Sequence, residues 1–332
     1  MSGIKKLRKI QLGRETTAGS ECNATALWRG TGTIQDNLEI VFPDEDVGYM
    51  SGVDRSYIPK TEGLLELDET PCTYEQVLHI LEMGVMTATP STAGGGNAYT
   101  YTFPTTAAAT TKTYTVEAGN NQQEEQFVYG FCPSFNLSGS AGEAVMMSAS
   151  IVGRQVAPGT YTTGVGVTTA TVEEVLFGKG ILGIDATSGA HGGTPQTSTF
   201  LDFNLDVDTG WRAVYTGDGA IYFTFPKNVG PEITLDVTFE HDTFGVAQVA
   251  AWRAQTAKLV QVKFTGATLT TTGSTYTTKN LIINLAGKWE SFDKIGERDG
   301  NDIVTGTLRA RYNATSTKFA EIIVVNNAAS VP

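Results

Sequence analysis

The residues that most often carry out chemistry in proteins are few and scattered in this chain. A zinc site needs about four convergent ligands, and the histidines and cysteines share no such spacing: His79, His191, His241, Cys22, Cys72 and Cys132. No Cys-x-x-Cys pair, Gly-x-Ser-x-Gly motif, Walker motif or dinucleotide fingerprint is present. Gly94–Gly96 lacks the lysine and the helix of a phosphate-binding loop. The sequence therefore predicts no metal, no cofactor and no catalytic site.

Three aspartates at alternate positions could be imagined as calcium ligands. Asp202, Asp206 and Asp208 alternate with Phe203, Leu205 and Val207 in one run. Strand geometry spreads their side chains along roughly 20 Å of one face, whereas a calcium loop needs a tight turn. The pattern therefore indicates that these aspartates lie on the solvent-exposed face of a half-buried strand. The many other acidic residues provide accidental carboxylate pairs, so they are weak evidence for a hydrolase.

Composition limits the class of protein. The 332 residues allow about two domains, and the formal net charge of -12 gives no basic footprint for nucleic acid. An acidic surface can still border DNA that has to slide past without sticking. An odd number of dispersed cysteines indicates folding in a reducing, intracellular compartment. We find no signal peptide and no apolar run of about 18 residues, so we expect no membrane segment.

Hydrophobic periodicity predicts a mainly β protein with two short helices. Helical spacing and a Thr73–Gln76 capping box predict a helix that ends at Gly84, and a second helix is expected over 244–257. Residues 1–25 are interpreted as an arm, 36–59 and 288–300 as long polar loops, and 157–172 as a linker. Alternation of apolar and polar residues, or β-rich composition, predicts strands at 26–34, 63–69, 99–103, 113–117, 126–137, 145–152, 201–207, 233–239, 259–264, 281–285, 303–311 and 319–325.

Short matches in the same order suggest an internal duplication. Phe135–Gly139 resembles Ile283–Gly287, and Leu65–Leu67 followed by Thr73 resembles Leu235–Val237 followed by Thr243. A chain that repeats one half-buried sheet unit and has no visible catalytic apparatus suggests a building block. We expect domains at 1–156 and 173–332.

Several motifs, in order, resemble the tail tube (major tail) proteins of siphophages. They are Gly13–Gly19 followed by Trp28, Gly48 with Tyr57–Pro59, Thr113–Glu117 before a Gly-Asn turn, Phe135–Gly139, and the strand ending at Gly153–Arg154. The resemblance covers most of residues 10–156; in the second half it rests on the repeat alone. It implies two tandem β-sandwich or barrel domains, each with a flanking helix.

The family resemblance also implies partners and a location. Six such domains form a ring around a lumen, which three copies of a duplicated chain would supply; six copies of a chain with one tube domain are the alternative. The stacked rings would form the phage tail, meet other tail proteins at the tube ends, and let double-stranded DNA pass without specific binding. The chain would fold in the host cytoplasm and act in the virion.

Two sets of charged residues are the candidate functional residues. An acidic lumen would repel DNA, and the candidates on wet strand faces are Glu66, Asp68, Asp236, Thr238 and Glu240, with Asp202, Asp206 and Asp208 as a second set that could equally face outward. Contacts between rings are assigned to the arm and the long loops: Lys5, Lys6, Arg8, Lys9, Asp44, Glu45, Asp46, Lys288, Asp293, Lys294, Glu297 and Arg298. The basic start could also touch nucleic acid, but docking on a neighbouring subunit is favoured.

A β-rich capsid-decoration or binding module is the main alternative, and a hydrolase on a β-sandwich is a more distant one. Self-assembly separates the first two, because a tube subunit forms stacked rings whereas a decoration module stays monomeric or trimeric. A deep pocket with a perturbed acid or nucleophile would indicate an enzyme.

Overall fold

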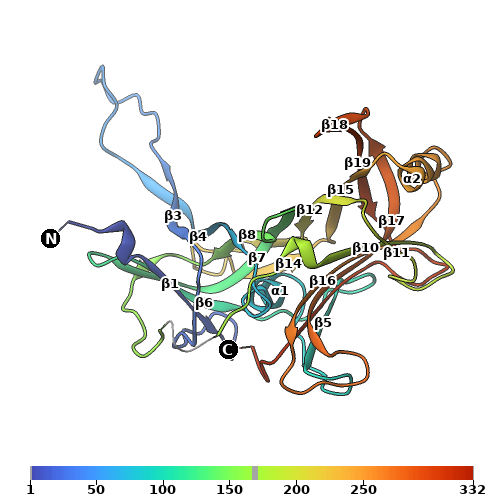
Figure 1. The fold of residues 1–332 in the computed structure, drawn as a ribbon. Helices are drawn as coiled ribbons and strands as arrows, with labels where there is room; N and C mark the ends of the chain where they lie inside the picture. Colours follow the sequence, from blue (N-terminus) through green and yellow to red (C-terminus); the bar gives the residue numbers. More distant parts are fainter. Residues whose placement is uncertain (1, 167–170, 332) are drawn as a thin grey trace.

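The protein is a mainly β structure in which about half of the residues lie in strands and two α-helices are present. A computed structural model describes residues 2–166 and 171–331 (Figure 1). The first part contains η1 (Lys5–Leu7), β1 (Lys9–Arg14), β2 (Ala26–Leu27), β3 (Gly32–Val41), β4 (Tyr57–Pro71), α1 (Val77–Gly84), β5 (Asn97–Thr102), β6 (Tyr114–Gly119), β7 (Glu124–Ser140), β8 (Met146–Gly153) and β9 (Ala157–Pro158).

The second part repeats the mixture of strands with one helix. It contains η2 (Phe177–Lys179), β10 (Gly180–Ala186), β11 (Pro195–Gln196), β12 (Phe200–Asp208), β13 (Trp211–Val214), β14 (Phe225–Asn228), β15 (Glu232–Glu240), α2 (Thr243–Arg253), β16 (Lys258–Thr268), β17 (Thr278–Phe292), β18 (Gly296–Arg298), β19 (Asn301–Ala310) and β20 (Ala320–Asn326). Apart from the β13–β14 pair, the strands join in one large antiparallel sheet.

Eight strands form the main stretch of this sheet, in the order β3–β4–β8–β7–β12–β15–β19–β17. The two long strands β7 and β17 each continue past this stretch. The first half of β7 pairs with β6 and β9, and the first half of β17 pairs with β16 and β20. These strands tie the main sheet to β-layers that cover its apolar face.

The same five pairings occur in the two parts of the chain. The first part is connected as β1–β6–β7–β8–β4–β3, and the second as β10–β16–β17–β19–β15–β12. A helix follows β4 and its counterpart β15. Leu65 lies opposite Ile151 and Leu235 opposite Leu308, so these leucines occupy equivalent places. The sequence match between Leu65–Leu67 and Leu235–Val237 is therefore a match between equivalent strands.

The other sequence match does not join equivalent places. Phe135–Gly139 lies in the second half of β7, against β8 and β12, whereas Ile283–Gly287 lies in the first half of β17, against β16. The structural counterpart of Gly287 is Gly130, because the pairing changes from one neighbour strand to another at these two glycines. Short apolar-polar motifs recur by chance in β-rich chains, which explains the false match.

The two parts of the chain share one hydrophobic core. Its buried side chains come from the apolar face of the main sheet, from α1 and from the covering strands, and include Leu65, Leu78, Leu205, Leu235 and Phe264. Strand β5 of the first part pairs with β20 of the second. Strand β12 of the second pairs with β7 of the first. The parts therefore interlock at two places.

Of the two helices, α2 begins with a side-chain cap, whereas the predicted cap of α1, Thr73, lies four positions before Val77 and closes the turn that leads into the helix. Thr73 Oγ1 accepts a hydrogen bond from Gln76 N at 3.1 Å, but the Gln76 side chain donates to Leu27 O rather than closing the capping box. Every residue of α1 is buried. Asp242 caps α2 by accepting from Gly245 N at 2.9 Å.

Parts of three segments that the sequence predicts to be irregular form strands. Residues 9–14 of the predicted arm form β1, because Ile10 and Leu12 are buried in the core. In the predicted loop 36–59, residues 36–41 belong to β3 and 57–59 to β4, whereas residues 42–56 form no strand and make the projecting tip of this hairpin (Figure 1). In the predicted loop 288–300, β17 continues to Phe292 and β18 pairs with β19. Tertiary pairing supplies the backbone hydrogen bonds of these polar segments, which periodicity alone does not reveal.

The predicted linker 157–172 has ordered contacts at its start. Ala157–Pro158 pairs with β7, and the Tyr161 hydroxyl donates to Lys9 O at 2.9 Å. Residues 167–170 of this prediction lie outside the described residues.

Candidate functional site: a polar face across both parts of the sheet

One face of the main sheet is polar from β4 to β19. Alternation within each strand puts apolar side chains on the core face and polar ones on the other, and the antiparallel registers line the polar ones up in rows. One row runs Glu66, Ser150, Ser134, Asp208 and Glu232.

Further rows lie parallel to the first. One contains Ser148, Asn136, Asp206, Thr234 and Arg309; the next contains Met146, Ser138, Asn204, Asp236 and Thr307; the last contains Ser140, Asp202, Thr238 and Thr305. The face therefore crosses the junction of β7 and β12. It includes residues of both sets of acidic candidates, although the sequence left open whether the second set faces outward.

Hydrogen bonds between neighbouring strands hold the acidic side chains of this face. Glu66 accepts from Ser150 Oγ at 3.0 Å, and Asp236 accepts from Thr307 Oγ1 at 2.6 Å. Asp206 accepts from Asn136 Nδ2 at 2.6 Å. These partners are neutral, so among the described contacts no positive side chain offsets these three carboxylates.

Of the other candidate lumen residues, Asp202 and Asp208 pair with arginines and Thr238 bonds to a hydroxyl. Asp202 forms an ion pair with Arg298 at 2.9 Å, so a predicted lumen residue and a predicted ring-contact residue neutralise each other. Asp208 pairs with Arg212; burial raises the pKa of this carboxyl, but hydrogen bonds from Arg212 and Gly210 outweigh it and hold the pKa below its usual value. Thr238 and Thr305 share a hydrogen bond of 2.8 Å. Glu240 lies half-buried at the end of β15.

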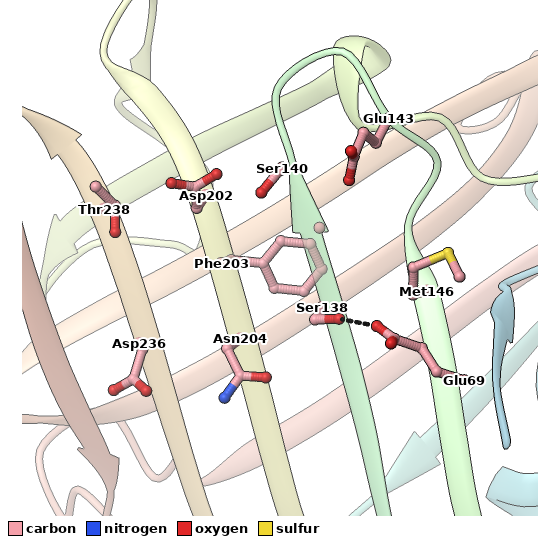
Figure 2. A pocket seen from close by; sticks show the side chains of 11 residues that line it. Glu69, Ser138, Ser140, Glu143, Met146, Asp202, Phe203, Asn204, Asp236 and Thr238 are labelled. Atoms are coloured by element: carbon pink, nitrogen blue, oxygen red, sulfur yellow. Dashed lines mark hydrogen bonds between the residues drawn. The ribbon is translucent and has the colours of Figure 1, made fainter. Parts of the chain in front are cut away.

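Asp68 does not lie with this group. A register shift between Leu67 and Thr70 puts an extra residue in β4, so that Glu69 reaches the polar face and accepts from Ser138 Oγ at 3.4 Å (Figure 2). Asp68 instead lines a cavity of about 500 Å³ beside the N-terminal segment. The alternation of core-facing and solvent-facing side chains is interrupted at this bulge, and no sequence pattern near Asp68 predicts the interruption.

The depressions on the polar face are shallow and lined by short polar side chains. One of about 230 Å³ lies between β7, β12 and β15, with Glu69, Ser138, Asp202 and Asp236 at its sides (Figure 2). Within the described residues, no three His, Cys, Asp or Glu side chains gather in a way that could hold a metal ion. The face is suited to repel anions or to hold water rather than to enclose a small molecule.

The candidates for ring contact occupy three places. Lys5, Lys6, Arg8 and Lys9 surround the cavity that Asp68 lines, and Lys9 Nζ lies 3.8 Å from the centre of the Tyr161 ring. Asp44, Glu45 and Asp46 lie beyond the end of β3, where Glu45 forms an ion pair with Arg55. Lys288 is exposed on β17, Asp293 and Lys294 follow it, and Glu297 accepts from Gly300 N at 2.6 Å.

The motif Gly13–Gly19 organises a polar cluster beneath the N-terminal strand. Glu15 is 1% exposed. Its carboxylate accepts from Thr113 Oγ1 at 2.6 Å, from Gly19 N at 2.7 Å and from Tyr129 N at 2.8 Å. Gly19 has φ +78°, and a Cβ there would lie 2.6 Å from the Tyr129 ring. These contacts make the motif a structural joint between β1, β6 and β7.

No protein-family model matches the chain, and a search of curated proteins finds no significant relative. Within the described residues, neither helix is long and apolar enough to cross a membrane.

Proposed function

We propose that the protein is a self-assembling ring subunit of a phage tail tube, built from two tandem tube domains. The observation that carries the proposal is the junction of β7 and β12. At this junction β12, the counterpart of β3 in the second part of the chain, pairs with β7 of the first part. Because the two parts, or units, have the same topology, the equivalent edges lie at the two ends of the main sheet: β3 at one end and β17, the counterpart of β7, at the other.

Those two edges have no strand partner among the described residues. β3 pairs only with β4. The second half of β17 pairs only with β19 and is the counterpart of the part of β7 that binds β12. Unpaired edges are a hazard that a closed barrel removes. Joining β17 of one copy to β3 of the next would repeat the internal junction and close a ring.

The proposed junction has a defined register. Ser134 pairs with Ser150 in β8, and its counterpart Ser291 pairs with Thr307 in β19. Asp208 lies opposite Glu232, and its counterpart Asn37 lies opposite Glu62. Because Ser134 pairs with Asp208 within the chain, Asn37 of one copy should lie opposite Ser291 of the next.

The resemblance to tail tube proteins implies six domains in a ring, hence three copies of this chain. In such a ring the polar face of the main sheet lines the lumen, and its unpaired carboxylates keep DNA from binding. The ring would stack in the tail, contact other tail proteins at the tube ends, and act in the virion during DNA ejection.

A disulfide trap tests ring closure and register together. We expect Asn37→Cys with Ser291→Cys, in a Cys22→Ser background, to give covalent closed trimers under oxidation, because paired strands bring Cβ atoms to about 5 Å. Asn37→Cys with Asp293→Cys shifts the register by two residues and should cross-link poorly. Electron microscopy and native mass spectrometry would show whether rings contain three copies.

Three results would contradict the proposal. A chain that stays monomeric at high concentration would point to a decoration or binding module. A ring of six whole copies would contradict the trimer. Equal cross-linking of the two cysteine pairs would contradict the register.

A further inference from the structure

The connection between β12 and β15 is docked on the first unit of the same chain. Residues 209–231 contain the β13–β14 hairpin, and Phe223 in this segment is fully buried against Phe131 and Tyr129, with ring centroids 5.5 and 5.4 Å apart. Arg154 donates to Phe223 O at 3.2 Å and to Thr224 O at 2.8 Å. The connection therefore covers the middle of β7 and the end of β8.

Two further hydrogen bonds hold the same connection against β4. The Tyr215 hydroxyl donates to Glu62 at 2.7 Å, and Thr61 N donates to Ile221 O at 3.0 Å. The receiving surface thus supplies one arginine just past the end of β8 and one glutamate on β4.

Within the described part of the chain, the equivalent connection of the first unit is docked only at its last two residues, Lys60 and Thr61, which contact Tyr215 and Ile221. Residues 38–61, between β3 and β4 positions that match Asp208 and Glu232, have nearly the same length as 209–231. They project as the end of a hairpin (Figure 1). Large apolar side chains on this projection are exposed: Leu38, Ile40, Phe42, Val47, Tyr49, Met50, Tyr57 and Ile58.

The equivalent receiving surface, on the second unit, is also uncovered. Arg311 follows β19 as Arg154 follows β8, and it is exposed, as is Tyr312 beside it. Glu232 is the counterpart of Glu62, and its side chain is 70% exposed. A shallow groove of about 210 Å³ lies here, lined in part by Arg311, Tyr312 and Phe319.

Charge indicates which partner fits this groove. Arg309 already lies near Glu232 and Glu290, at 3.6 and 3.4 Å, but Lys288 and Arg311 form no ion pair within the described part of the chain. On the projecting connection, Glu45 is paired with Arg55, which leaves Glu39, Asp44, Asp46 and Asp54 without an ion pair among the described residues. The projecting segment is thus acidic and apolar, whereas the groove carries two arginines, one glutamate and an exposed tyrosine, which makes the two complementary.

We infer that residues 38–59 of one copy dock on the groove lined by Arg309, Arg311 and Tyr312 of the next copy, beside Lys288, as residues 209–231 dock within the chain. This inference rests on the proposed ring, in which β3 of one copy lies beside β17 of the next. It assigns the projecting connection to contact within a ring, whereas the sequence assigned the same loop to contact between rings.

Hydrogen exchange of the segment 42–56 tests this assignment. We compare dilute monomer, isolated single rings and stacked tubes by mass spectrometry. Docking should slow amide exchange in single rings by about tenfold or more, because the segment would gain a buried surface. Arg311→Glu should remove most of that protection, and Asp44→Lys with Asp46→Lys in the Arg311→Glu chain should restore it. Arg253→Glu, an exposed charge reversal on α2, is the matched control.

The outcomes separate this inference from the proposed function. If no ring forms, both are overturned. If rings form and exchange in 42–56 stays at the monomer rate, the docking is wrong and the ring stands. If protection appears only in stacked tubes, the connection makes contacts between rings and the docking within the ring is again wrong.

Discussion

At the residue scale, the most consequential buried charges join the N-terminal strand to α1. Arg14 Nε lies 2.6 Å from Glu82, whose side chain is fully buried. Burial raises the pKa of Glu82 despite the nearby Arg14. Removing one partner of a buried pair leaves the other uncompensated, which costs more than removing both.

The Arg14–Glu82 pair gives the first prediction. Arg14→Met should lower the free energy of unfolding by about 3 kcal/mol. Arg14→Met with Glu82→Gln should recover a large part of that loss, since no buried charge remains. Urea denaturation of the two variants measures the difference. A double variant that is no more stable than Arg14→Met would show that the pair acts through packing and not through its charge.

His79 gives a prediction on pH. The imidazole is buried beside Tyr114 OH at 3.3 Å, and desolvation, with a contribution from Arg14, lowers the pKa of His79 from 6.5 to about 4. The unfolded chain binds the proton more readily, so this residue costs no stability above pH 6.5 and destabilises the fold as pH falls toward 4. Between pH 7.5 and 4.5 the loss should be about 2–3 kcal/mol.

His79→Phe isolates that effect from the titration of carboxylates. The variant should be less stable than the wild type at pH 7.5, because Tyr114 loses its partner, and this deficit should shrink or reverse at pH 4.5. Thermal denaturation at the two pH values measures it. A deficit that is the same at both values would mean that His79 is protonated in the folded protein.

At the element scale, two equivalent arginines have different surroundings. Arg154 stacks on Tyr129 at 4.5 Å and holds the docked connection 209–231, whereas Arg311 is exposed. In the monomer, Arg154→Met should lower the free energy of unfolding by about 2 kcal/mol through lost charged hydrogen bonds and should speed hydrogen exchange in β13–β14. Arg311→Met is the matched control and should change neither. Equal effects of the two substitutions would contradict the assigned contacts.

The strands with clean alternation could be predicted from sequence, and the pairing partners could not. β12 and β15 appear within one residue of their predicted bounds because Phe203, Leu205, Leu235 and Val237 alternate with polar residues. The outer part of β3 is exposed on both faces and shows no such pattern. The hydrogen bond from Asn136 to Asp206 depends on the pairing of β7 with β12, which lie in different parts of the chain. No local sequence pattern encodes that pairing.

At the scale of the whole molecule, the polar face is continuous because the second unit adds its β12 edge to the first. Acidic residues from both units then lie on one surface, and between β4 and β15 no lysine or arginine belongs to its described rows. Two of its carboxylates, Asp202 and Asp208, are neutralised by arginines. Among the described residues, Glu66 and Asp236 accept hydrogen bonds from hydroxyls and Asp206 accepts them from amides, so no arginine or lysine offsets these three carboxylates.

Charge reversal of this face gives the last prediction, which depends on the proposed tube. Glu66→Lys with Asp236→Lys should leave the fold within about 2 kcal/mol of the wild type, since exposed strand positions tolerate such changes and the variant loses two hydroxyl hydrogen bonds. Assembled tubes of the variant should retain double-stranded DNA at low salt and release it as salt rises, because counterion release drives phosphate binding. Glu21→Lys with Glu174→Lys changes the net charge equally at exposed sites that belong to none of these rows. If both variants retain DNA equally, net charge alone governs binding and the polar face has no special role; if neither does, the face does not line the path of the DNA.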